Sequence, residues 1–366
     1  MTAAPPASAL ATPDELVGRV FDSMVQTLEL FCLYVGDQLG FYQALHDGGP
    51  ATSSELAARA GTNERATREW LEQQATAGFL VCDNPERDAA ERRYALPDGY
   101  AAVLVDRDSL SIVPPMAQIT AGSVAPLSKL LAAFRADGGV PYADYGHDLH
   151  AGQAGMTRPL FVHQLAQEWI PAMPEIDARL RTDPPARVAD IGMGQGWSSM
   201  ALARGYPKIA VDGFDLDAAS VAAAQRNARE AGMDERVHFQ VRDAGDPALA
   251  GQYDLALAVE CIHDMADPVS VLRSMRRLVG PGGTVLIVDE RVPDAFAPNG
   301  DAVERMMYGF SVLHCLPVGM AGQPSVGTGT VMRRPTFRRY AAEAGFQAVA
   351  ELPIANDFYR FYRLTA

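Results

Sequence analysis

A short apolar strand followed at once by closely spaced glycines constrains the fold of this chain most. Residues Arg187–Ile191 have the apolar character of a buried strand, and residues Trp197–Arg204 that of a helix. Three glycines lie between them: Gly192, Gly194 and Gly196. Such glycines let the backbone turn tightly and approach a ligand at a helix N-terminus. The dinucleotide fingerprint needs its third glycine where this chain has Trp197, so NAD and FAD are disfavoured.

Aspartates recur at the ends of the strands around this loop. The strand Lys208–Phe214 is followed by Asp215 and Leu216, the strand Val237–Val241 by Asp243 and Ala244, and the first strand contains Asp190. Parallel strands end at one edge of a sheet, so we expect these acids to lie together there. Asp215 stands where a carboxylate can accept both hydroxyls of a ribose. With no lysine or arginine among the glycines, the pattern favours a cationic sulfonium nucleoside over a phosphorylated one.

Strands and helices alternate from residue 183 to residue 366, after Pro184-Pro185. This alternation predicts a doubly wound α/β domain with helices on both faces of a parallel sheet. Residues 106–182 are helical in pattern and carry clustered aromatic and histidine residues, Trp169 among them. We interpret them as a helical connector that lines a pocket.

The N-terminal part predicts a winged-helix module over residues 16–105. Residues 21–45 have the spacing of one long amphipathic helix, Thr52-Ser-Ser-Glu55 fits a capping box, and Glu64–Thr76 continues as a second helix. Leu80-Val81 and Tyr94-Ala95-Leu96 have the character of the two wing strands. Residues 1–15, rich in Ala, Pro and Ser, predict a disordered leader.

Composition excludes several classes of partner. The net charge of −14 repels polyanions, so neither nucleic acid nor an anionic membrane is an expected partner. No stretch approaches the roughly 18 apolar residues of a membrane span, and the N-terminus lacks a signal-peptide pattern, so a cytoplasmic protein is expected. The four cysteines have neither metal-site nor disulfide spacing.

Residues 183–366 resemble the class I S-adenosylmethionine-dependent methyltransferase fold in the loop Asp190–Gly196, the acids Asp215 and Asp243, and the turn Pro281-Gly-Gly283 before the strand Thr284–Asp289. The resemblance implies a Rossmann-like sheet of seven strands that ends in an antiparallel hairpin. It also implies S-adenosylmethionine as cofactor, with the loop glycines at its methionine part. With the N-terminal module included, the chain is similar to bacterial small-molecule methyltransferases that dimerise through a winged helix, among them the mycobacterial winged-helix methyltransferases, and to caffeate-type O-methyltransferases. A homodimer is therefore expected.

The loop after the strand Tyr253–Val259 holds the catalytic candidates. It contains Glu260, a predicted cofactor contact, and the pair His263-Asp264. An imidazole with a pKa of about 6.5 can take a proton at neutral pH. The pair matches the loop in which caffeate-type enzymes carry their base, although those enzymes continue with an aromatic residue where this chain has Met265. We therefore expect His263 to be the general base for a hydroxyl acceptor, with Asp264 as its orienting partner; a histidine that only packs is the alternative.

The helix Glu304–Cys315 places Met307, Phe310 and His314 on one face. In the similar enzymes this helix lines the acceptor pocket, which implies a small apolar or aromatic metabolite contacted by these residues and by Trp169. A core-facing stripe is the other interpretation. Glu260, His263 and His314 could also form a two-histidine, one-carboxylate metal set, as in some α-keto acid C-methyltransferases that resemble this family. No metal is expected, and metal-assisted C-methylation is an alternative function.

Two further alternatives stay open. A winged-helix transcription regulator with a ligand-sensing domain would need a basic recognition face, but residues 51–80 hold three arginines against four glutamates. Some relatives use the same scaffold for decarboxylation, hydroxylation or rearrangement without methyl transfer.

Overall fold

The computed structural model describes residues 12–280 and 282–365 and divides the chain into two compact units, residues 1–117 and 118–366. Residues 1–11 of the predicted leader and Pro281 lie outside the described residues. Residues 13–15 of that leader are helical, because α1 (Pro13–Gln38) begins at Pro13. The Thr12 side chain accepts a hydrogen bond from the Glu15 N–H and the Glu15 side chain bonds back to Thr12, and this capping box fixes the helix start.

The first unit contains a helix-turn-helix followed by a two-stranded wing. Its elements after α1 are α2 (Phe41–Gly48), α3 (Ser53–Ala60), α4 (Glu64–Thr76), β1 (Val81–Cys82), β2 (Tyr94–Ala95) and α5 (Ala101–Leu104). The expected single helix over residues 21–45 is two helices, because the backbone turns at Gly40 (φ 68°). Trp70 packs against Phe41 and Tyr42 in the core and donates its indole N–H to the Cys32 carbonyl at 2.8 Å.

A helical segment connects this unit to the sheet. It consists of α6 (Pro114–Val124), α7 (Leu127–Ala133), the 3₁₀-helix η1 (Tyr142–Tyr145), α8 (Gly146–Leu160), the π-helix η2 (Phe161–Trp169) and α9 (Pro174–Arg181). The strap between α7 and η1 is fixed to the second unit, since Val140 donates its N–H to the Pro317 carbonyl at 2.9 Å.

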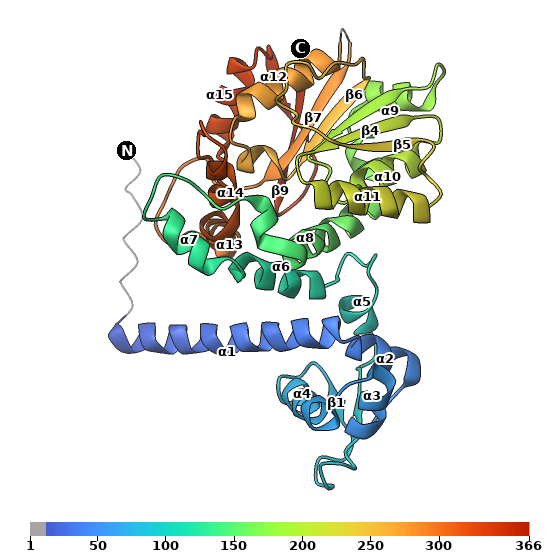
Figure 1. The fold of residues 1–366 in the computed structure, drawn as a ribbon, viewed down its shortest axis with the longest axis vertical. Helices are drawn as coiled ribbons and strands as arrows, with labels where there is room; N and C mark the ends of the chain where they lie inside the picture. The colour runs from blue at the N-terminus through green and yellow to red at the C-terminus, as the bar shows by residue number, and fades with distance from the viewer. Residues whose placement is uncertain (1–11, 281, 366) are drawn as a thin grey trace. The chain divides into compact units, whose positions relative to one another are not determined.

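The second unit is built on a seven-stranded sheet in the order β5-β4-β3-β6-β7-β9-β8 (Figure 1). The strands are β3 (Arg187–Ile191), β4 (Ala210–Asp215), β5 (Val237–Val241), β6 (Leu255–Val259), β7 (Thr284–Glu290), β8 (Ala348–Glu351) and β9 (Tyr359–Thr365). The first five in this order are parallel, and β9 is antiparallel to both of its neighbours. The predicted fold class is confirmed, including the closing hairpin.

Helices cover both faces of this sheet. They are α9, α10 (Trp197–Gly205) and α11 (Ala218–Glu230) on one face and α12 (Pro268–Leu278) and α15 (Arg334–Glu343) on the other. The other helical elements of this part of the chain are the 3₁₀-helix η3 (Ile262–Asp264), α13 (Ala302–Phe310), the π-helix η4 (Ser311–Cys315) and α14 (Leu316–Ala321). Successive residues of β7 alternate between two cores: Leu286 and Val288 pack with α9, α10 and α11, and Val285 and Ile287 with α12 and α15. Burial on both faces explains why every residue of β7 is buried.

No helix among the described residues has the length and apolar character needed to cross a membrane.

Candidate functional site

A cavity of about 770 Å³ lies at the carboxyl ends of β3, β4, β5 and β6. Its floor is formed by the loops that follow these strands, and its opposite wall by residues from η1, α8, the start of η2 and α14. In a doubly wound sheet, ligands bind in this crevice where the strand order reverses. Here the order reverses between β3 and β6.

Two glycines of the loop after β3, Gly194 and Gly196, have different structural roles at the cavity floor. Gly194 and Gly196 both have left-handed backbones, with φ of 53° and 80°. A Cβ on Gly196 would lie 2.5 Å from the Phe239 ring, whereas a Cβ on Gly194 would meet no atom within 4 Å. Gly196 therefore allows close packing of the loop, and Gly194 leaves open space on the cavity side.

Asp190 is a buried carboxylate that ties the loop to α10. Ser198 and Ser199 both donate their hydroxyls to its Oδ2 at 2.6 Å. Burial raises the pKa of Asp190 to about 6, against the effect of these two hydrogen bonds. The residue lies on the cavity lining, together with Gly192, Gly194 and Ser198.

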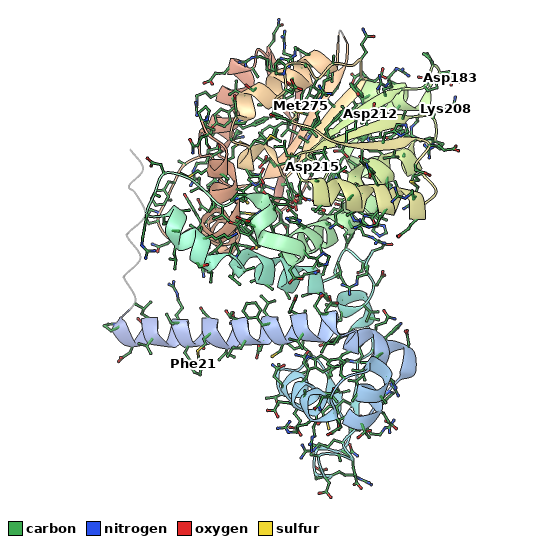
Figure 2. All side chains as sticks on the ribbon, viewed as in Figure 1. Phe21, Asp183, Lys208, Asp212, Asp215 and Met275 are labelled. Carbon is green, nitrogen blue, oxygen red and sulfur yellow. The ribbon has the colours of Figure 1, made fainter. Side chains whose placement is uncertain are left out.

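Asp215 lies at the end of β4, beside the glycine loop (Figure 2). Its carboxylate accepts the backbone N–H groups of Gly194 and Asp217, each at 2.9 Å. Burial raises the pKa of Asp215 above its ordinary value. The two hydrogen bonds hold the carboxylate at the cavity edge, where Leu216 exposes 70 % of its side chain. Asp243 lies at the end of β5, accepts the Gly245 N–H at 2.7 Å and also lines the cavity with Ala244.

The loop after β6 contributes three carboxylates to the cavity, Glu260, Asp264 and Asp267. Glu260 has a left-handed backbone (φ 53°), which is uncommon for a residue with a side chain and costs of order 1 kcal/mol. Burial raises its pKa, although the Tyr359 hydroxyl hydrogen-bonds to it. Burial also raises the pKa of Asp264 to about 7, so this carboxyl is poised between its two protonation states at neutral pH.

His263 is buried between β7 carboxylates and is not part of the cavity lining. Its Nδ1 lies 2.8 Å from Asp289 Oδ1 and 2.8 Å from Glu290 Oε2. Burial favours a neutral imidazole, but the charges of Glu290 and Asp289 outweigh it and raise the pKa of His263 well above its usual range. The two acidic neighbours therefore favour the protonated ring, in which both nitrogens donate and neither offers a lone pair to accept a proton.

The four residues predicted to contact the acceptor do not line the cavity. Trp169 is a core residue, with its ring 5.0 Å from that of Phe361. Met307 and His314 are buried and Phe310 is partly buried. Burial lowers the pKa of His314 to about 3. Trp169 was expected from a cluster of aromatic residues, which does not distinguish a core residue from a pocket residue. His314 lies in a π-helix, where a turn holds an extra residue, so the regular helical spacing used for its prediction does not apply.

The wall opposite the glycine loop is made of residues that helical periodicity alone did not identify. It consists of Tyr142, His150, Gln153, Thr157, Phe161 and Val318, which we call the acceptor wall. The rings of Tyr142 and His150 stack at 4.2 Å, and the Tyr142 hydroxyl donates to Gln153 Oε1 at 3.2 Å. Four of the six follow one another on one face of α8 and η2 at spacings of three and four residues. Because half of them are polar, hydrophobic periodicity gives no signal for this face.

The two-histidine metal set that the sequence offered as an alternative is not assembled among the described residues. The donor atoms that do come together are those of His263, Asp289 and Glu290, all within 4.8 Å of one another. His314 and Glu260 do not belong to this cluster.

Two family models match separate parts of the chain. Residues 28–106 match an Rv2258c-like winged HTH domain, and residues 183–318 match a methyltransferase domain. The second match covers the glycine loop, Asp215, Asp243 and the loop after β6.

Similar proteins extend this comparison. Norajmaline N-methyltransferase from Rauvolfia serpentina is 35% identical over 115 residues, which are 30% of this chain and 39% of that protein. A ubiquinone biosynthesis O-methyltransferase from Sodalis glossinidius is 36% identical over 98 residues, 27% of this chain and 39% of the relative. The chain thus spans about two fifths of the length of the curated relatives it matches.

Solved structures share the fold along almost the whole chain. Human N-acetylserotonin methyltransferase in complex with SAM has a TM-score of 0.68 at 17% identity, covering 98% of this chain and 99% of that one. PigF with SAH has a TM-score of 0.67 at 22% identity, covering 97% and 100%. An O-methyltransferase family protein from Burkholderia thailandensis has a TM-score of 0.66 at 17% identity, covering 98% of each chain.

Proposed function

Because this chain carries a methyltransferase domain behind a winged helix-turn-helix domain, we propose that it transfers a methyl group from S-adenosylmethionine to a small, largely apolar metabolite. The observation that carries the proposal is the Asp215 carboxylate, which is held at the cavity edge by two backbone N–H groups and is partly buried without a cationic partner among the described lysines and arginines. A carboxylate in this position is suited to receive the two hydroxyls of a ribose.

The cavity fits the cofactor in shape and charge. Open space above Gly194 leaves room for the methionine part, and Leu216, Asp243 and Ala244 form the far end, where an adenine would lie. When bound, S-adenosylmethionine supplies a methyl group activated by a positively charged sulfur. The acidic lining stabilises that charge, while the glycine loop, Asp190 and Glu260 fix the walls around it.

The proposal is tested by substituting Asp215 with asparagine. Asp215→Asn turns one accepting oxygen into a donor and removes the charge, so S-adenosylhomocysteine binding should weaken about hundredfold, which corresponds to the loss of about two charge-assisted hydrogen bonds. Asp183→Asn is the matched control, because Asp183 is exposed, pairs with Lys208 at 2.6 Å and does not line the cavity. Isothermal titration of both variants with S-adenosylhomocysteine measures the effect. An affinity of Asp215→Asn equal to that of wild type would contradict the proposed nucleoside site.

His263 is assigned a positioning role in this proposal. The ion pair with Asp289 and Glu290 holds the loop that carries Glu260 and Asp264 against β7. A general base would need to face the cavity, whereas His263 is buried and is not among the residues that line it, which favours the positioning role.

Metal-assisted C-methylation finds less support. His263, Asp289 and Glu290 are close enough to bind an ion, but His263 Nδ1 already contacts both acids, and none of the three lines the cavity. Metal analysis of the untagged protein tests this interpretation, because a stoichiometric metal ion would favour metal-assisted C-methylation instead.

The transcription-regulator alternative lacks a basic face. On α4, Arg65 pairs with Glu69 at 2.5 Å and Arg68 lies 3.4 Å from Glu64. In α3, Arg59 donates to the carbonyls of Ala44 and Gly49. With its arginines engaged locally, the helix-turn-helix has little free positive charge for phosphates.

A second copy of the chain is the proposed partner of α1. This helix exposes an apolar stripe in which Val17, Phe21 and Leu28 are 68%, 59% and 58% exposed (Figure 2 labels Phe21). A stripe of this length on one helix face is typical of a helix that packs against another chain. A homodimer through the N-terminal unit would cover it.

A further inference from the structure

Within the proposed function, we infer that the acceptor is an amine on an apolar, largely aromatic skeleton without carboxylate or phosphate, and that Asp264 takes the proton that the nitrogen loses. The inference rests on the methyltransferase proposal and names its substrate class. It departs from the hydroxyl acceptor expected from the sequence.

The charge of the cavity lining excludes an anionic acceptor. Carboxylates that line it come from all four floor loops: Asp190, Asp215, Asp217, Asp243, Glu260, Asp264 and Asp267. Among the described residues no lysine and one arginine, Arg242, line the cavity, and Arg242 is paired with Asp246 at 3.0 Å. His150 is the other basic group, with Nδ1 3.7 Å from Asp217 Oδ2. A carboxylate or phosphate would meet no lysine and no unpaired arginine of the lining, whereas a protonated amine would be attracted by the acids and a neutral amine would not be repelled.

The acceptor wall presents uncharged groups apart from His150. Phe161 and Val318 supply apolar surface, the ring of Tyr142 supplies an aromatic face, and the Gln153 amide and Thr157 hydroxyl supply polar atoms. The Thr157 hydroxyl already donates to the Gln153 carbonyl at 3.2 Å. Such a lining suits an aromatic skeleton, which can stack on Tyr142, and offers no fixed positive charge to an acid.

Asp264 is the carboxylate best placed to receive a proton from that acceptor. It lines the cavity from the loop after β6, below α14, where its backbone lies 3.0 Å from the position of a Cβ on Gly319. No lysine or arginine of the described chain pairs with it, and His263 next to it is engaged by Asp289 and Glu290. The titratable groups around it are His263, Asp289, Asp215, Tyr142, Cys261 and Cys315. Two of these, Asp289 and Asp215, are carboxylic acids that discourage a further negative charge and so favour proton uptake by Asp264.

The chemical step balances with these groups alone. The lone pair of the acceptor nitrogen forms the new N–C bond to the methyl group, and the electron pair of the broken C–S bond stays on sulfur. The nitrogen then carries an extra positive charge, and its N–H proton moves to the Asp264 carboxylate and from there to water. A carboxyl with a raised pKa accepts a proton from an N-methylated aryl ammonium more readily than from a neutral phenol.

The test uses matched aromatic triplets with the full-length protein saturated with S-adenosylhomocysteine. One triplet is 5-aminoindole, 5-hydroxyindole and indole-5-carboxylate, and a second is the same series on quinoline substituted at position 6. Ligand-observed NMR should show amines bound at least about tenfold more tightly than the carboxylates, because the latter enter an acidic cavity. Equal or tighter binding of the carboxylates, or no binding of any amine, would overturn the inference. Failure of S-adenosylhomocysteine itself to bind would instead refute the proposed function.

Turnover with S-adenosylmethionine separates nitrogen from oxygen. Mass spectrometry should find methylated amine, and methylation of the hydroxyl member with the amine untouched would overturn the inference. With the best amine, Asp264→Asn should lower kcat at least about tenfold and abolish the rise of kcat with pH, while S-adenosylhomocysteine affinity stays the same. Asp301→Asn, which keeps the helix cap of α13 outside the cavity, is the control for a lost carboxylate. An unchanged pH profile in Asp264→Asn would refute its role.

Discussion

Two alanine substitutions in the glycine loop separate its packing role from its binding role. Gly194 and Gly196 lie two residues apart, both with left-handed backbones, so alanine at either position pays a similar conformational cost. The two positions differ in the atoms that an added Cβ would contact. A Cβ on Gly196 meets Phe239 at 2.5 Å and Ala224 at 3.0 Å, both buried, whereas a Cβ on Gly194 meets nothing within 4 Å.

The expected magnitudes follow from this contrast. A left-handed alanine costs about 1–2 kcal/mol, partly offset by the about 0.4–1 kcal/mol that alanine removes from the entropy of the unfolded chain. Gly194→Ala should therefore lower the free energy of unfolding by about 1 kcal/mol. Gly196→Ala adds overpacking of about 1–3 kcal/mol against Phe239, for a total of about 3 kcal/mol. For a unit of this size the second variant should melt roughly 6–12 °C below wild type.

The variant that loses less stability, Gly194→Ala, should be the one that loses affinity for the cofactor. The Cβ of Gly194→Ala projects into the space proposed for the methionine part, so affinity for S-adenosylhomocysteine should fall at least about tenfold in a protein that is nearly as stable as wild type. Urea unfolding and isothermal titration on both variants measure the two effects. Equal loss of stability in the two variants, or wild-type affinity in Gly194→Ala, would refute this division of roles.

Three further substitutions test other parts of the structure. His263→Ala should lower the free energy of unfolding by about 3 kcal/mol in urea at pH 7, because it removes the buried partner of Asp289 and Glu290; a variant with full stability but no turnover would restore the general-base role. Asp264→Asn should become more stable relative to wild type as pH rises from 4 to 8. Folding raises the pKa of Asp264 to about 7, so the wild-type protein loses stability over this range as the carboxyl is forced to ionise, and the variant does not. A difference in unfolding free energy between the two proteins that stays constant from pH 4 to 8 would contradict this. Phe21→Glu should convert a dimer to a monomer in light scattering at micromolar concentration, while the exposed Phe296→Glu in the second unit should not; a dimer that survives Phe21→Glu would place the interface elsewhere.

The backbone of the site was predictable because its signals are local. Asp190, Asp215 and Asp243 fall at strand ends, and topology then brings parallel strand ends to one edge whatever the side chains do. The capping boxes at Thr12 and Thr52 are equally local, since each involves residues three apart. The capping box at Thr12 also shows a limit: the composition of residues 1–15 predicted disorder, but a single cap starts the helix at Pro13.

The acceptor side was less predictable because it depends on departures from regular geometry. The π-helix η4 changes which residues share a face with those of α13, and His314 lies outside the lining. Trp169 was expected only as a member of an aromatic cluster, and it packs in the core. The polar residues of α8, such as Gln153, have no hydrophobic periodicity that would mark them as a wall. A π turn has no strong sequence signal of its own, so contacts that depend on it emerge only in three dimensions.

His263 and Asp264 show how adjacent residues of one motif acquire opposite roles. They lie on a single 3₁₀ turn, where successive side chains point about 120° apart, so only one of them can face the cavity. The carboxylates of Asp289 and Glu290 at the end of β7 attract the histidine, and the aspartate faces the cavity by default. The acidic pair at the end of β7 thus selects which residue of the motif can exchange a proton with an acceptor. Replacing both acids with amides would remove the attraction that holds the imidazolium, lower the pKa of His263 and free its ring to compete with Asp264 for the acceptor's proton.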